Sequence, residues 1–265
     1  MRFHSLALCI LLLCGCGKTE PVDPAPVTAT PSKPQIYTVN YPLAWLAQEL
    51  GGDRVQAVFP APADADPAYW KPDAEVIGLY QRADLVLLNG AGYAKWVSQA
   101  SMPSSRLIDT SERFHNQIIY ADKGSVHSHG PEGEHSHGEA AFTLWLDPVL
   151  MSLQARTISA ALEKMLPDDQ QGIDQRLVAM RARTGKWNTE LHRTFRLLEE
   201  APVLFSHPDY QYLQQRHELN GHALHWEPGQ APSDQQWRQL EALLENHPAK
   251  IMLWEDEPLP QTADK

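Results

Sequence analysis

The feature that most constrains the fold is a repeated alternation of short apolar runs and amphipathic stretches, interrupted once by helical sequence alone. The run 83–89 (ADLVLLN) is apolar almost throughout, as expected of a parallel strand covered on both faces. Strands are also predicted at 35–40, 54–59, 106–110, 202–206, 221–227 and 249–254, and helices at 42–50, 73–82, around Trp96, 208–217 and 233–246. Two helical segments, 147–166 and 167–200, separate the groups. The pattern predicts an α/β protein: two β/α lobes with parallel sheets, joined by a long helical spine.

The first 34 residues predict a targeting segment and a tether. Residues 1–15 have a basic start and an apolar run too short to span a bilayer as a helix, which is typical of a signal peptide. The sequence LCGC ending at Cys16 resembles a bacterial lipobox, so Cys16 is the expected lipidation site and first mature residue. An ordinary cleaved signal peptide with an incidental cysteine is the alternative. Residues 16–34 are expected to form a proline-rich linker.

Charge and cysteine content exclude two classes of site. The net charge is −11, from 22 Lys and Arg against 33 Asp and Glu, whereas a nucleic-acid binder needs a basic face. All three cysteines lie within the first 16 residues. The rest of the chain therefore has neither a disulfide nor a thiolate metal site.

A histidine-rich segment is the strongest chemical signal. The sequence VHSHGPEGEHSHGE contains His127, His129, His135 and His137, four of the twelve histidines in the chain. Imidazole nitrogens bind zinc, copper and nickel well, so the segment predicts metal binding. A solvated charged loop, or one that responds to pH, is the alternative.

Polar residues also follow three of the predicted strands. His207 ends the strand 202–206, Glu227 (or His225) ends the next, and Glu255 ends the last, beside two further acids. Ligands of parallel sheets bind at the carboxyl ends of strands, so these residues predict a mixed nitrogen and oxygen metal site in a cleft between the lobes. A capping or core role for His207, and simple solvation of the acids, are the alternatives. Zinc fits such a set best, and nickel and copper stay open.

The order of several motifs resembles that of a known family. The motifs are YPLAW (41–45), DPAYWKP (66–72), ADLVLLNGAG (83–92), the histidine-rich loop, LWLDP (144–148) and SHPDY (206–210). Together they resemble the zinc-uptake (ZnuA-like) solute-binding proteins of bacterial ABC importers. The resemblance implies two β/α lobes joined by a rigid helix, with zinc or manganese bound between them. It also implies an extracytoplasmic protein that hands metal to a membrane permease.

The expected ligand set is incomplete. Family members usually have histidines where this chain has Ala68 and Thr143, while His207 matches a third family histidine. Three alternatives are open for this site. The loop histidines supply the missing nitrogens, or one of the acids Glu255, Asp256 and Glu227 completes an oxygen-rich site. In the third alternative, the cleft binds something else. In the last case aromatic residues would line a site for a ligand such as a metal chelate; they are Tyr69, Trp70, Trp145, Trp226 and Trp254.

The resulting hypothesis is a periplasmic or cell-surface zinc-binding protein, anchored to a bacterial membrane by lipid, that delivers metal to an ABC importer. No phosphate-binding GxxxxGK[ST] loop is present, so a permease and its ATPase subunit are the expected partners of a monomer. A periplasmic metal buffer or metallochaperone with a vestigial cleft is the alternative. A hydrolase using His207 and Glu255 is disfavoured because HExxH and GxSxG are absent, so no enzyme is expected.

The expected domain boundaries follow from the same pattern. They are a lipoprotein signal peptide at 1–15, the linker at 16–34, an N-terminal lobe at 35–165 that carries the loop 124–139, a connecting helix at 166–200 and a C-terminal lobe at 201–265.

Overall fold

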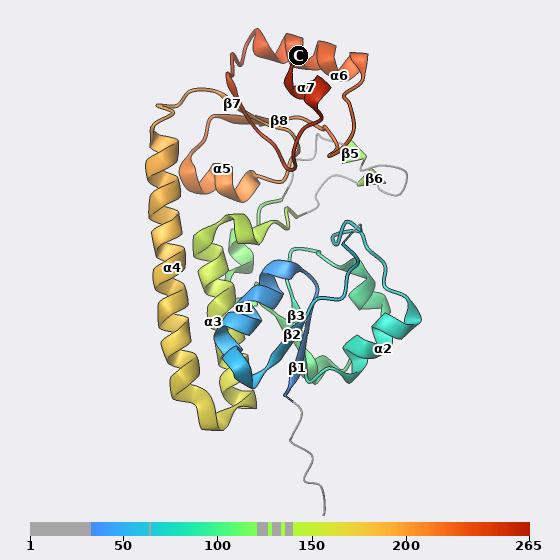
Figure 1. The fold of residues 1–265 in the computed structure, drawn as a ribbon, viewed down its shortest axis with the longest axis vertical. Coiled ribbons are helices and arrows are strands. Elements are labelled where there is room, and N and C mark those ends of the chain that lie inside the picture. The colour runs from blue at the N-terminus through green and yellow to red at the C-terminus, as the bar shows by residue number, and fades with distance from the viewer. Residues whose placement is uncertain (1–32, 64, 121–126, 129–133, 136–139) are drawn as a thin grey trace, which may run out of the picture. The chain divides into compact units, whose positions relative to one another are not determined.

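The computed structural model describes residues 33–63, 65–120, 127–128, 134–135 and 140–265, and residues 33–265 form one compact unit (Figure 1). The predicted signal peptide and nearly all of the linker, including Cys16, lie outside the described residues. No helix in the described part of the chain is both long enough and apolar enough to cross a membrane.

The first sheet has four parallel strands in the order β2-β1-β3-β4. The strands are β1 (Gln35–Thr38), β2 (Gln56–Val58), β3 (Leu85–Leu88) and β4 (Leu107–Asp109). The sheet pairs Ile36 with Leu85 and Val86 with Leu107, which places β3 between two neighbours. Its apolar run is correspondingly buried, as the sequence predicts.

Capping residues start the helices that flank this sheet. Helix α1 (Tyr41–Gly51) follows Asn40, whose side chain accepts a hydrogen bond from Leu43, and α2 (Ala74–Arg82) begins after the predicted N-cap Asp73. The helix expected around Trp96 is instead a short 3₁₀ turn, Lys95–Gln99. Ala94 precedes it in a left-handed conformation, so a regular α-helix cannot run through this segment.

Two long helices, α3 (Pro148–Met165) and α4 (Gln170–Arg196), pack against each other (Figure 1). Helix α4 has 27 residues, about 40 Å at 1.5 Å per residue. It is shorter than the predicted 167–200, because a 3₁₀ turn (Pro167–Asp169) precedes it and non-helical backbone follows it. Arg176 holds α4 to α1 by donating a hydrogen bond of 2.6 Å to the carbonyl oxygen of Leu50.

The second sheet has three parallel strands in the order β8-β7-β9. The elements of this region are β7 (Val203–Phe205), α5 (Gln211–His217), β8 (Gly221–Ala223), α6 (Asp234–Leu244), β9 (Ile251–Leu253) and α7 (Pro260–Ala263). Two predicted boundaries are wrong. The helix predicted from 208 begins at Gln211, after the N-cap position Tyr210, and the strand predicted to 227 ends at Ala223.

The remaining elements are short. The 3₁₀ turns are η1 (Gly52–Arg54), η3 (Ser104–Arg106), η4 (Glu112–Gln117) and η6 (Leu144–Leu146). In the histidine-rich segment, β5 (His127–Ser128) pairs antiparallel with β6 (Glu134–His135), so that His127 lies opposite His135. An antiparallel bridge between Tyr120 and Ala140 lies at the base of this segment.

Candidate metal centre

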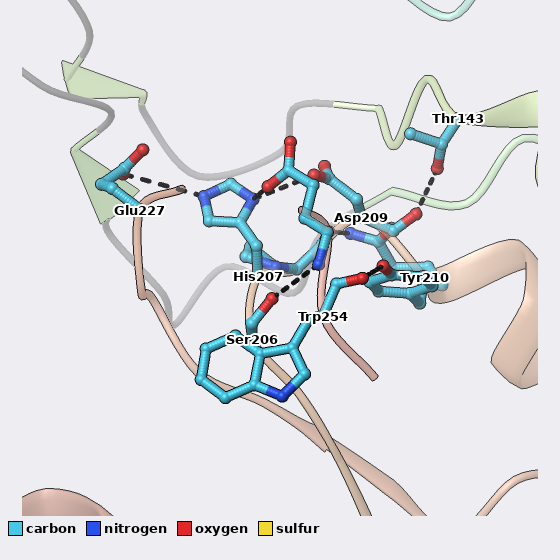
Figure 2. A network of polar contacts seen from close by, with 10 residues as sticks. Thr143, Ser206, His207, Asp209, Tyr210, Glu227 and Trp254 are labelled. Carbon is cyan, nitrogen blue, oxygen red and sulfur yellow. Dashed lines mark hydrogen bonds and ion pairs between the residues drawn. The ribbon is translucent and has the colours of Figure 1, made fainter. Parts of the chain in front are cut away.

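His207 lies in the loop that follows β7, the central strand of the second sheet (Figure 2). The residue is 5% exposed, a low value for a histidine outside regular secondary structure. The chain turns at Pro208 and brings Asp209 back beside the imidazole ring, at 3.0 Å from Nδ1 to Oδ2. The end of the central strand thus supplies one nitrogen and one carboxylate donor.

The neighbouring strands add two more carboxylates. Glu255 follows β9 and lies 3.6 Å from His207 Nδ1 through Oε2, while Glu227, beyond β8, lies 3.8 Å from Nε2 through Oε1. The structure therefore brings together the three residues that the sequence places at strand ends. Sequence reasoning missed Asp209, although this residue stands only two positions after His207.

Hydrogen bonds from several segments hold these loops in place (Figure 2). Ser206 Oγ accepts from the backbone N–H of Glu255 at 3.0 Å, and Tyr210 donates to the carbonyl oxygen of Trp254 at 2.8 Å. The Thr143 hydroxyl donates to the carbonyl oxygen of Asp209 at 2.5 Å. These bonds therefore fix the backbone of the loops that carry the donors.

The geometry suits a small divalent cation. Ligand atoms of His207, Asp209 and Glu255 all lie within 4.8 Å of one another. Two donors about 2.1 Å from a tetrahedral zinc ion are themselves about 3.4 Å apart. The contacts of 3.0 and 3.6 Å at Nδ1 bracket that separation, so small side-chain movements would allow these groups to share one ion.

Electrostatics at the cluster favour a bound cation. Burial raises the pKa of Glu255 to about 7, with further contributions from Asp209, Asp66 and Glu227, while His207 acts in the opposite sense. Burial opposes protonation of His207, but its hydrogen bond to Asp209 and the charges of Asp209, Glu255 and Glu227 raise its pKa overall. The crowded negative charge is thus balanced by protons, which a metal ion would displace.

Zinc binding should therefore depend steeply on pH. Glu255 must lose its proton to ligate, so we expect the affinity to fall by about tenfold per pH unit below pH 7 for each proton displaced. Dissociation constants from pH 5.5 to 8, and calorimetry in buffers of different ionisation enthalpy, measure this effect. Glu255→Gln should release fewer protons on binding, whereas the exposed neighbour Asp256→Asn serves as the control. An affinity unchanged between pH 5.5 and 7 would contradict the expectation.

The same shift has a consequence for the metal-free protein. Because the pKa of Glu255 is raised in the folded state, its contribution to stability is present below about pH 4.5 and is lost as the pH rises toward 7. Metal binding should restore stability in that range, since the ion replaces the proton.

The histidines of the loop are the other predicted ligands. His127 and His135 are paired through their backbone strands, while His129 and His137 lie outside the described residues. Thr143, where the resemblance implies a histidine, donates a hydrogen bond to the carbonyl oxygen of Asp209, and Ala68 lies in the wall of a cavity. His225 packs near His207, with ring centroids 6.3 Å apart.

The aromatic residues that the sequence places near the cleft divide into three groups. Trp226 and Trp254 pack together in the core beneath the second sheet, with ring centroids 5.8 Å apart. Trp145 lines an apolar groove of about 700 Å³ beside α1 and α4. Tyr69 and Trp70 line a separate cavity of about 610 Å³.

Comparison with known families identifies the family of the chain. The family described as zinc-uptake complex component A, periplasmic (ZnuA), matches residues 36–265. The chain belongs to this family. Because the ZnuA family consists of solute-binding proteins of transporters, the predicted resemblance and the expectation that the chain is not an enzyme are both confirmed.

Individual relatives are distant. The high-affinity zinc uptake system protein ZnuA of Bacillus subtilis is 23% identical over 98% of this chain and 82% of its own length. The manganese ABC transporter substrate-binding lipoprotein PsaA of Streptococcus pneumoniae is also 23% identical, over 72% of this chain and 60% of its own. The latter match thus spans less than two thirds of the relative.

A solved structure confirms the fold class. The Zn(II)-bound ZnuA-like domain of Streptococcus pneumoniae AdcA superposes with a TM-score of 0.73 and 17% identity, covering 88% of this chain and 82% of that one. The two-sheet α/β architecture with long helices is therefore that of the family.

Proposed function

We propose that this chain is the extracytoplasmic zinc receptor of an ABC importer. The observation that carries the proposal is the cluster of His207, Asp209 and Glu255, whose ligand atoms lie within 4.8 Å of one another at the carboxyl ends of parallel strands. One nitrogen and two carboxylate donors form a set suited to a borderline divalent ion. Glu227 lies at the other ring nitrogen, Nε2, where it would orient the imidazole ring rather than ligate the same ion.

Zinc is the proposed cargo, and manganese is the nearest competitor. The relatives are named for one or the other metal. Manganese favours oxygen-rich sites, whereas imidazole strengthens the preference for zinc, nickel and copper. The buried imidazole at the centre of the cluster therefore supports zinc. Parallel titrations with manganese, nickel and copper test the order of the metal affinities.

Location and partners follow from the same proposal. Lipidation at Cys16 would anchor the protein to a bacterial membrane on its periplasmic or outer surface. A permease with its ATPase subunit would then receive the metal, and the protein itself would act as a monomer. Palmitate labelling, compared with that of Cys16→Ala, tests the anchor.

The histidine-rich segment supports the alternative of a metal buffer or metallochaperone. Its backbone pairing places His127 opposite His135, and four histidines lie within residues 127–137. We propose that these histidines bind zinc more weakly than the cluster, because a chain segment that must become ordered on binding loses entropy.

Calorimetry separates the two functions. We expect residues 33–265 to bind one zinc ion tightly and further ions weakly, and deletion of residues 127–137 to remove the weak sites alone. Tight binding that disappears with the deletion would instead support the buffer. The compact unit 33–265 is the protein to use, and a variant with the four loop histidines changed to serine controls for the shortened chain.

A further inference from the structure

A cavity of about 610 Å³ is far larger than a bare metal ion requires and falls within the range of sites for small organic ligands. Six of its lining residues are aromatic: Tyr69, Trp70, Tyr93, Trp96, Tyr120 and Phe142. Two lysines, Lys71 and Lys95, also line it. Aromatic walls with ammonium groups suit a flat ligand that carries negative charge.

Contacts between aromatic rings hold part of the cavity wall in place. Tyr93 and Phe142 make an edge-to-face contact with ring centroids 5.2 Å apart, and Trp96 packs in the same way against the buried Tyr80 at 4.9 Å. Such packing restricts these three rings, so this part of the cavity wall is formed before a ligand arrives.

Two connections place this cavity beside the metal cluster. Phe142, in its wall, is followed by Thr143, whose hydroxyl bonds to the backbone of Asp209. On another side, Ala68 donates its backbone N–H to Asp66 at 2.9 Å. The negative charge of Asp66 also contributes to the raised pKa of Glu255, so Asp66 is near the cluster.

The donor count at the cluster leaves room for an outside ligand. His207, Asp209 and Glu255 supply three donors, whereas zinc takes four and can expand to five. Neutral imidazole, two carboxylates and Zn²⁺ sum to no net charge, and one more anionic donor would bring this ligand set to −1. Asp66 and Glu227 add negative charge near the cluster, so the lysines of the cavity are needed to offset the charge of an anionic ligand.

We propose that the cavity holds the organic part of a metal chelate, a planar aromatic carboxylate, while His207, Asp209 and Glu255 hold its metal ion. This inference rests on the proposed function, because it assumes that the cluster binds the cargo. The ligand's carboxylate and ring nitrogen complete the coordination of the ion. Its ring lies among the aromatic side chains, and Lys71 and Lys95 offset its charge.

The test uses pyridine-2-carboxylate, a flat chelator with one nitrogen and one oxygen donor. Zinc alone, the chelator alone and their 1:1 complex are each titrated into the protein, with calorimetry for affinity and native mass spectrometry for the composition of the bound species. We expect a ternary species of protein, zinc and chelator, with the complex binding at least tenfold more tightly than zinc alone.

Charge variants locate the chelator. The double substitution Lys71→Gln/Lys95→Gln should weaken binding of the zinc–chelator complex about tenfold. The affinity for zinc without chelator should not change. Lys164→Gln/Lys186→Gln, on exposed faces of α3 and α4, is the matched control and should change neither.

The outcomes separate the two claims. Tight binding of zinc without a ternary species, or simple removal of zinc by the chelator, overturns the inference and leaves the proposed function standing. A ternary species that is equally stable in both lysine double variants also overturns the inference. Failure to bind zinc in any form overturns the proposed function and the inference together.

Discussion

Replacing His207 with alanine is expected to weaken zinc binding by about a hundredfold or more. The imidazole is the central donor of the cluster, 3.0 Å from Asp209 and 3.6 Å from Glu255. A complete structural zinc site is worth about 10–16 kcal/mol, so one ligand of four accounts for roughly 2.5–4 kcal/mol. Competition against a chromophoric zinc chelator at pH 7.5 measures the change.

The control is another histidine of the same sheet. His222 lies on β8 and is exposed, and it packs against His247 rather than near the cluster. His222→Ala should therefore leave zinc affinity unchanged. Equal affinities of His207→Ala and the parent protein would place the tight site elsewhere and argue for the histidine-rich segment.

The second large effect concerns stability. Asp147→Ala is expected to lower the free energy of unfolding by about 3 kcal/mol. The carboxylate side chain is only 5% exposed, caps α3 through the backbone N–H of Val149 at 2.8 Å and pairs with Arg216 at 2.7 Å. Its loss removes a helix cap and leaves the guanidinium group of Arg216 without this partner. Urea denaturation of the metal-free protein measures the change.

Asp73→Ala separates capping from ion pairing. Asp73 caps α2 by accepting a hydrogen bond from Val76 at 2.9 Å, and it is exposed. Its substitution should lower the free energy of unfolding by about 1 kcal/mol, the usual contribution of an N-cap residue. If Asp73→Ala and Asp147→Ala lowered the free energy of unfolding equally, the ion pair between Asp147 and Arg216 would make no measurable contribution to stability.

Several features of the fold could be predicted because they depend on local sequence. The apolar run 83–89 predicts a buried parallel strand and forms β3, and Asp73 predicts the start of α2. The alternation of strands and helices predicts two parallel sheets, and the rule for strand ends then predicts that His207, Glu227 and Glu255 meet. Periodicity and topology are sufficient for these conclusions.

Other features depend on contacts between distant segments. Asp209 joins the cluster because the turn at Pro208 directs it back toward His207, and because Thr143, 66 positions earlier, holds its carbonyl oxygen. The turn at Trp96 is 3₁₀ because Ala94 adopts a left-handed conformation, which no local pattern signals.

The sequence by itself determined most of the order of strands and helices, the edge of the second sheet where we propose that a metal binds, and the presence of a histidine-rich segment. Only the tertiary structure decided which carboxylates converge on His207, and that Ala68 lies in the wall of an aromatic cavity. The physical reason is that spacing along the chain determines only how neighbouring side chains are directed. A cluster forms only when loops from separate strands come into contact.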